Sequence, residues 1–381
     1  MSKPKKIMLV FGTRPEAIKM APVVQRLKAE PNFFDVQTCV TAQHRQMLDQ
    51  VLKTFDITPD FDLDVMKPGQ DLFDVTASVL VEMKGIFSHS KPDAVLVHGD
   101  TTTTLATALA GFYAGVPIGH VEAGLRTHDL YAPFPEEFNR QVASKVTRWH
   151  FAPTELSRTN LIAERVDDES ITVTGNTVID ALHWVLNRIE TDKDRSSRVI
   201  KSLSRATSFD WQAERFVLIT GHRRENFGDG FLQICEALRE LAYRFRDVHF
   251  VYPVHLNPNV QAPVHRILAD LPSVHLIEPL DYEPFIYLLK HSYIVLTDSG
   301  GIQEEAPSLG KPVLVMREVT ERPEAVEAGT VELVGANRDR IVASVALLLK
   351  DEEHYSKMAL AHNPYGDGNA CDRIACILRD I

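Results

Sequence analysis

Short apolar runs typical of β-strands alternate with amphipathic segments along the whole chain of 381 residues. In the first half, the predicted strands cover residues 7–11, 36–40, 93–97, 118–121, 150–152 and 171–174. In the second half, they cover residues 216–220, 249–253, 274–277, 294–297, 313–316 and 330–334. Segments with helical spacing of apolar residues lie between them, such as 16–29, 45–55, 72–87 and 103–114. This alternation predicts an α/β fold with parallel sheets and right-handed crossovers.

Two such series predict two doubly wound, Rossmann-like domains with a cleft between them. We place the N-terminal domain at residues 1–178 and the C-terminal domain at residues 179–364. The polar stretch 190–208 lies near the divide, and the sequence NPYGDG at 363–368 interrupts regular structure. We expect the last segment, 365–381, to form a helix that packs back on the N-terminal domain.

Net charge, apolar runs and cysteine spacing limit the kinds of partner and compartment expected for this chain. A formal net charge of −11 argues against binding to a nucleic-acid backbone, so any anion site has to be local. The basic start MSKPKK leads into an apolar stretch too short for an export signal, and no apolar run approaches a membrane span. The four cysteines form no CxxC pattern, which is typical of free thiols in a reducing cytosol. We therefore expect a cytoplasmic protein with neither a nucleic-acid nor a membrane partner.

Three acids lie at or just beyond the carboxyl ends of predicted strands. Asp100 follows the run at 93–97, Glu122 follows the run at 118–121, and Glu136 comes one loop later. Open α/β sheets bind ligands beyond the carboxyl ends of their strands. Carboxylates gathered there can move protons or hold a metal ion.

Each acid also has an ordinary structural explanation. Asp100 or the threonine after it could cap a helix, and Glu136 could be a first-turn acid that complements the helix dipole. His98, His120 and His128 lie nearby, so a metal site is the main alternative. The first two precede an acid by two residues, which suggests that they face away from it and serve to orient it.

Two loops carry local positive charge beside a glycine. Gly12 is followed by Arg14 and Lys19 at the start of a predicted helix, where free N–H groups favour an anion. In the second half, His222 and two arginines follow the strand at 216–220. In the first loop, solvated surface charges explain the sequence as well as an anion site does. In the second loop, the glycine with its basic neighbours favours an anion site.

A second glycine turn follows the strand at 294–297. Ser299, Gly300 and Gly301 predict a tight turn with exposed N–H groups suited to a diphosphate. Glu305 lies just inside the helix that follows and could accept the hydroxyls of a ribose. Phe285 could stack on a base or belong to the core.

Six motifs together resemble the non-hydrolysing UDP-N-acetylglucosamine 2-epimerases of bacteria. They are GTRPEAIK at 12–19, VHGDTTTT at 97–104, HVEAGLR at 120–126, GHRREN at 221–226, DSGGIQEEAP at 298–307 and TERPE at 320–324. The resemblance implies a glycosyltransferase-B-like fold with a nucleotide-binding C-terminal domain, a homodimer, and no cofactor or metal. It further implies interconversion of UDP-GlcNAc and UDP-ManNAc, which supplies ManNAc-type sugars for cell-surface polysaccharide synthesis.

The same resemblance assigns roles to matching positions. Asp100, Glu122 and Glu136 match catalytic acids, and His222 matches a catalytic residue that contacts the diphosphate. The remaining substrate contacts implied are Arg14, Lys19, Phe285 beside the uracil, Ser299, Gly300, Gly301, Glu305 and Arg322. In some members a second UDP-GlcNAc activates the enzyme, and its contacts would fall on Gln43, His44, Gln46, Gln70 and His255. An arginine that some members have beside that last glutamine is Gly69 here.

The chemistry implied is elimination and re-addition of UDP through 2-acetamidoglucal. We assign proton transfer to Asp100 and Glu136, and stabilisation of the cationic transition state to Glu122. The alternatives are a glycosyltransferase of the same architecture, a hydrolysing epimerase, a metal-dependent phosphoesterase and a sensor that binds without turnover.

Overall fold

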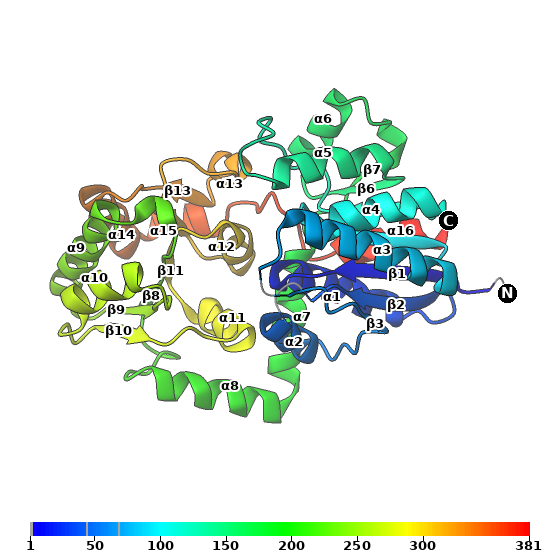
Figure 1. Cartoon of the computed structure of the whole chain (residues 1–381). Helices are drawn as coiled ribbons and strands as arrows, with labels where there is room; N and C mark the ends of the chain where they lie inside the picture. Colours follow the sequence, from blue (N-terminus) through cyan, green and yellow to red (C-terminus); the bar gives the residue numbers. More distant parts are fainter. Residues whose placement is uncertain (1–2, 43–44, 68) are drawn as a thin grey trace. The chain divides into compact units, whose positions relative to one another are not determined.

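The computed structural model describes residues 3–42, 45–67 and 69–381. The chain divides into two compact units, Met1–Trp184 with Tyr365–Ile381, and Val185–Pro364. Each unit contains one parallel sheet covered by helices (Figure 1). The α/β prediction is confirmed, and each unit is doubly wound in the Rossmann-like manner.

The first unit is built on a seven-stranded sheet in the order β3-β2-β1-β4-β5-β6-β7. Residues 7–11 of β1 are fully buried, because helices cover both faces of the sheet, and this explains its unbroken apolar sequence. The strands are β1 Lys5–Phe11, β2 Phe34–Val40, β3 Phe61–Asp62, β4 Ala94–His98, β5 Ile118–Val121, β6 Trp149–Ala152 and β7 Ile171–Val173.

Several helices of the first unit begin at side-chain caps. Thr13 and Glu16 form a capping box at the start of α1, and Thr101 caps α4. The cap of α4 is therefore Thr101 rather than Asp100, which leaves the Asp100 carboxylate for other contacts. The helices are α1 Arg14–Lys28, α2 Arg45–Thr54, α3 Leu72–Ser90, α4 Thr102–Ala114, α5 Glu136–Val146, α6 Glu155–Ala163, η1 Asp168–Ser170 and α16 Ala370–Arg379; α7 Thr177–Thr191 crosses the division between the units.

The C-terminal helix α16, red in Figure 1, packs against α1 of the first unit. Arg379 Nε donates to Glu30 at 2.8 Å. The Asp180 carboxylate on α7 accepts the backbone N–H of Cys371 at 2.8 Å, which satisfies a donor at the start of α16. Residues from both ends of the sequence thus complete one unit.

The second unit is built on a six-stranded sheet in the order β10-β9-β8-β11-β12-β13. Its strands are β8 Phe216–Thr220, β9 His249–Pro253, β10 Val274–Ile277, β11 Ile294–Thr297, β12 Val313–Val315 and β13 Val331–Leu333. Its helices are α8 Lys193–Ala206, η2 Arg224–Asn226, α9 Asp229–Arg244, α10 Pro258–Leu268, α11 Tyr282–His291, α12 Gly300–Glu305, η3 Ala306–Leu309, α13 Pro323–Glu327, α14 Arg338–Lys350 and α15 Glu352–Ala359.

The strand order places a topological switch point in each unit, where the direction of winding reverses. It lies between β1 and β4 in the first unit and between β8 and β11 in the second. Ligands of open α/β sheets bind beyond the strand ends at such points. Among the helices described, none is long and apolar enough to cross a membrane.

Candidate active site

Asp100 lies just beyond β4, at the switch point of the first unit, and is held by α5. Arg140 donates to Asp100 Oδ2 from Nε at 2.9 Å and from Nη2 at 2.6 Å. Asn139 donates to the backbone carbonyl of Asp100 at 2.8 Å. The side chain of Asp100 stays 27% exposed, so one of its faces is open to a ligand. The helix that begins at Glu136 therefore fixes the orientation of the first acid.

Glu122 follows β5 and is held more firmly. Its backbone has φ of 62°, in the left-handed region, and its side chain is only 8% exposed. Lys19 of α1 forms an ion pair with Glu122 Oε1, and Asn176 Nδ2 donates to the same oxygen at 2.8 Å. His98 Nε2 lies 3.5 Å from Glu122 Oε2. Glu122 is thus a buried, fixed carboxylate and not the surface partner of Arg126.

Glu136 and Glu137 occupy the first turn of α5 but differ in environment. Glu137 is fully buried and accepts the backbone N–H of Thr127 at 3.0 Å and Arg140 Nη1 at 3.2 Å. Burial acts to raise the pKa of Glu137, and these hydrogen bonds, with one from Gln141, outweigh it and lower the pKa. Glu137 therefore anchors the loop before α5. Glu136 is half-buried, and its Oε2 has no hydrogen-bond partner within the described residues.

His98 and His120 are buried next to Glu122 and to the loop that carries Asp100. His98 lies beside Glu122, which follows the neighbouring strand, and the expectation that His98 faces away from Asp100, the acid it precedes by two residues, stays a prediction. His120 Nε2 donates to the carbonyl of Gly99 at 2.7 Å and so supports the loop that carries Asp100. Burial lowers the pKa to about 4 for His98 and about 3 for His120, so both are neutral at pH 7. Neutral imidazoles here favour a role in orienting the acids.

The N-terminal loop differs from the expected anion site. The Glu16 carboxylate accepts the backbone N–H groups of Gly12 at 3.0 Å and Thr13 at 2.7 Å. Glu16 is 2% exposed and also accepts the hydroxyl of Thr101 at 2.6 Å. The N–H groups of Gly12 and Thr13 are therefore not free for an anion as expected, because the Glu16 carboxylate of the capping box accepts both. Arg14, half-buried at the start of α1, still offers a positive charge there.

In the second unit, Asp298 connects the loop after β11 to the loop after β8, and these two loops lie at the switch point. Its Oδ2 accepts the backbone N–H groups of His222 and Arg223, each at 2.8 Å. The side chain of His222 is 43% exposed and stacks on His255, with ring centroids 5.3 Å apart. Burial and the neighbouring positive groups lower the pKa of His222, while Asp298 acts to raise it.

The glycine turn lies beside an arginine that is already positioned. A Cβ atom placed on Gly300 would lie 3.3 Å from Cζ of Arg322, so the guanidinium packs on this turn. Arg322 Nε donates to Glu304 at 2.8 Å, and Glu304 is 1% exposed, so Glu304 is not an ordinary surface acid. Glu305 is also buried and accepts the hydroxyl of Tyr282 at 3.1 Å. Ser299 and Gly301 flank Gly300 in the same turn, and Phe285 is half-buried on α11.

Three of the five residues implied to contact a second UDP-GlcNAc lie within the described structure. Gln43 and His44 lie outside the described residues. Gln46 is exposed on α2, and Gln70 accepts the backbone N–H of Lys67 at 2.6 Å. His255 stacks on His222, so it lies with the candidate diphosphate contacts of the second unit.

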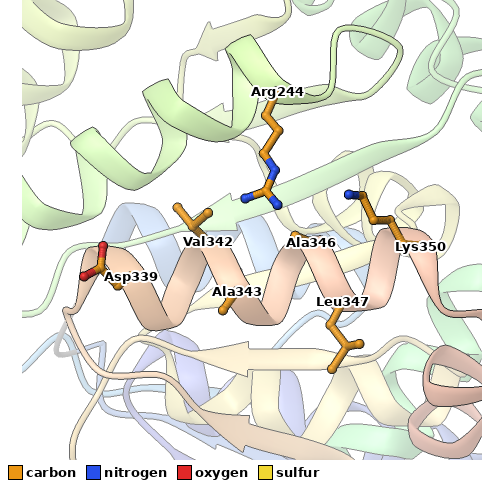
Figure 2. A pocket seen from close by; sticks show the side chains of 7 residues that line it. All are labelled: Arg244, Asp339, Val342, Ala343, Ala346, Leu347 and Lys350. Atoms are coloured by element: carbon orange, nitrogen blue, oxygen red, sulfur yellow. The ribbon is translucent and has the colours of Figure 1, made fainter.

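Two further points concern the described parts of the chain. No group of three or more His, Cys, Asp or Glu side chains in them could hold a metal ion. A surface hollow of about 420 Å³ lies along α14 beside the end of α9, and none of the predicted site residues lines it (Figure 2). Its lining residues are Arg244, Asp339, Val342, Ala343, Ala346, Leu347 and Lys350.

Two site residues escaped the sequence analysis. Arg140 follows Glu136 and Glu137 at spacings that place all three near one another on a helix, and this spacing was the available signal. Asn176 comes three residues after the end of β7, at the same sheet edge as the acids. A polar residue just beyond the carboxyl end of a strand was the signal for Asn176.

The fold and the two switch points define a class. Two doubly wound parallel units, with fixed acids in one and a glycine turn beside an arginine and a buried acid in the other, are typical of glycosyltransferase-B-like proteins that handle nucleotide sugars. A family model described as UDP-N-acetylglucosamine 2-epimerase matches residues 25–379. The chain belongs to this family of isomerases, which confirms the resemblance.

Individual relatives agree over almost the whole length. The UDP-N-acetylglucosamine 2-epimerase of Escherichia coli K12 is 58% identical over 376 residues, 98% of each chain. The structure of UDP-GlcNAc 2-epimerase from Neisseria meningitidis bound to UDP-GlcNAc has 50% identity and a TM-score of 0.88, covering 99% of this chain and 100% of that one. The enzyme from Methanocaldococcus jannaschii in complex with UDP-GlcNAc and UDP has 31% identity and a TM-score of 0.79, covering 99% and 100%.

Proposed function

We propose that this protein interconverts UDP-GlcNAc and UDP-ManNAc by eliminating UDP and adding it back. The observation that carries the proposal is the set of acids at the switch point of the first unit, each held in a different way. Relatives bound to UDP-GlcNAc, and to UDP-GlcNAc with UDP, support the choice of substrate.

The chemistry explains why several acids are needed. The proton on carbon 2 is not next to a carbonyl, so direct deprotonation is very unfavourable. The bond from carbon 1 to the diphosphate can break first, which places positive charge on carbon 1 and makes the neighbouring proton acidic. A carboxylate then removes that proton and leaves 2-acetamidoglucal and UDP. Return of a proton to the opposite face, followed by re-addition of UDP, inverts carbon 2.

The three carboxylates suit different parts of this sequence. The Glu122 side chain is buried beside His98 and held by Lys19 and Asn176, which suits a constant negative charge that stabilises the cationic transition state. Asp100 keeps an exposed face and Glu136 keeps a carboxylate oxygen without a partner in the described structure. These two are the better placed to exchange protons with the sugar.

Most of the groups suited to the nucleotide belong to the second unit. His222 and Arg322, together with the turn Ser299–Gly301 and with Arg14 of the first unit, would stabilise the leaving diphosphate. Glu305, held by Tyr282, would accept the ribose hydroxyls, and Phe285 would lie beside the uracil. Lys19 would contact the ligand from its position beside Glu122.

Proton NMR of UDP-GlcNAc incubated with the protein in D2O tests the reaction. We expect UDP-ManNAc with deuterium at carbon 2, and an unlabelled or unchanged sugar would contradict the proposal. Free ManNAc with UDP would indicate a hydrolysing epimerase, a requirement for an acceptor would indicate a glycosyltransferase, and loss of activity on chelation would indicate a metal site.

Variants test the assignment of the acids. Asp100→Asn and Glu136→Gln should each lower kcat by about 100-fold or more, because each removes a proton-transfer group. Glu155→Gln is the matched control, since Glu155 is another first-turn acid whose side chain is 74% exposed. A loss of less than about 10-fold in both site variants would move proton transfer to other groups.

We further infer that the protein acts as a cytoplasmic homodimer that supplies ManNAc-type sugars for cell-surface polysaccharides. The family resemblance supports the dimer, and the free thiols of Cys39, Cys235, Cys371 and Cys376 are typical of a reducing compartment. Light scattering of the purified protein should give twice the mass of one chain. A need for added UDP-GlcNAc when UDP-ManNAc is the substrate would support activation by a second ligand.

A further inference from the structure

Asn176 links Glu122 to the point where the chain returns to the first unit. It lies beyond β7, is 3% exposed, and donates from Nδ2 to Glu122 Oε1 at 2.8 Å. Its backbone N–H donates to the carbonyl of Tyr365 at 2.7 Å. Tyr365 is the first residue of the returning segment, since residues 185–364 belong to the second unit. One residue therefore contacts the acid through its side chain and the returning chain through its backbone.

The geometry around this link leaves little freedom. Asn176 Oδ1 accepts the backbone N–H of Val178 at 3.0 Å, which sets the orientation of the amide so that its NH2 group points at Glu122. On the other side, a Cβ atom on Gly366 would lie 3.2 Å from Cα of Gly175, with φ of 124° at Gly366 and 86° at Gly175. Glycine at both positions lets the two backbone segments touch. A shift of the returning segment would therefore move Asn176.

We propose that Asn176 is a positioning residue that fixes the Glu122 carboxylate relative to the returning segment at Tyr365 and Gly366. The inference rests on the proposed function, because it assumes that Glu122 acts on the substrate. Asn176 acts only through Glu122. Lys19 from α1 and His98 from β4 also face this carboxylate.

Asn176→Asp tests the link because it keeps the shape and replaces the donor by a carboxyl group. When the new acid is ionised it repels Glu122, and when it is protonated it can donate as the amide does. We expect kcat to fall about 10- to 150-fold at pH 8, the effect of losing a hydrogen bond to a charged group, and to recover as the pH is lowered. Binding of UDP should change by less than about 3-fold, because Phe285, Glu305 and Arg322, which are proposed to contact the uracil, the ribose and the diphosphate, lie in the second unit and do not depend on Asn176.

Asn160→Asp is the matched control. Asn160 Nδ2 donates to the carbonyl of Gly124 at 3.0 Å, in the same loop but to backbone rather than to a carboxylate. We expect this variant to keep kcat within about 3-fold and the pH profile of the wild type, since it leaves Glu122 untouched. An equal loss in both variants, or a kcat for Asn176→Asp within about 10-fold of wild type at pH 8, would overturn the proposal.

A double-mutant cycle separates positioning from general damage to the fold. If Asn176 acts through Glu122, the double variant Glu122→Gln with Asn176→Asp should have the kcat of Glu122→Gln alone, and multiplied losses would overturn the proposal. Should Asn176→Asp fail to fold, Asn176→Ser removes the donor without adding charge. It should lower kcat by about 10-fold or more at every pH, and a smaller loss would overturn the proposal. A wild type without epimerase activity would instead overturn the proposed function itself.

Discussion

Acidification should destabilise the first unit through His120, a residue buried within β5. His120 is 0% exposed, its Nε2 donates to Gly99, and its Nδ1 has no hydrogen-bond partner in the described structure. A proton added at Nδ1 would place a charged, unsatisfied donor in the core. Burial is the main reason that the pKa of His120 falls to about 3.

The direction and size of this pH effect on stability follow from the difference in the pKa of His120 between the folded and unfolded states. In the unfolded chain the imidazole has a pKa of about 6.5, so below that pH the unfolded state binds a proton that the folded state refuses. The stability due to neutral His120 is complete above pH 6.5 and is lost as the pH falls toward about 3. Between pH 7.5 and pH 5.0 the free energy of unfolding should drop by about 2 kcal/mol from this residue.

His120→Gln isolates this contribution, because glutamine can donate to the Gly99 carbonyl and does not titrate. Hydrogen exchange of peptides covering β5, measured against urea at both pH values, reports the stability of the first unit alone. The wild type should lose about 2 kcal/mol more than the variant on acidification. His98 is present in both proteins, so its effect cancels. Equal losses in the two proteins would refute the reasoning.

Three further substitutions are predicted. Gly119→Ala would place a methyl group 2.5 Å from a side-chain carbon of Leu96, so overpacking should cost about 1–3 kcal/mol and lower the urea midpoint. Tyr282→Phe removes the hydroxyl that donates to Glu305, and steady-state kinetics should show KM raised by about 10-fold with kcat nearly unchanged. Arg140→Gln weakens the charge-assisted bonds to the first acid, so kcat should fall by about 10- to 100-fold while UDP affinity, measured by calorimetry, stays constant.

The sheets could be predicted because buried parallel strands are continuous apolar runs. Five strands, β5, β8, β9, β10 and β11, have the predicted bounds. The strand β3 was missed, since Phe61–Asp62 is two residues long and carries no apolar pattern. Helix α1 begins at Arg14, two residues before the prediction, because Thr13 and Glu16 close a capping box there. Local sequence patterns therefore predict buried strands well, and they predict short edge strands and helix caps less well.

The acids of the candidate site could be predicted from their places at strand ends, but their partners could not. Arg140 reaches Asp100 across 40 positions of sequence, and Asn176 reaches Glu122 across 54. No local spacing encodes such pairs. Arg322 likewise reaches Glu304 across 18 positions, and the structure buries Glu304 against it.

The packing of α16 on α1 has a consequence for the order of assembly during synthesis. The second unit is a continuous stretch, Val185–Pro364, and all of its residues leave the ribosome before the last helix does. The first unit, although most of it is made earliest, waits for residues Ala370–Arg379 to cover α1. The N-terminal part of a nascent chain therefore stays incomplete until residues 370–379 have been made, and a stop codon before residue 370 would destabilise the part of the protein encoded first.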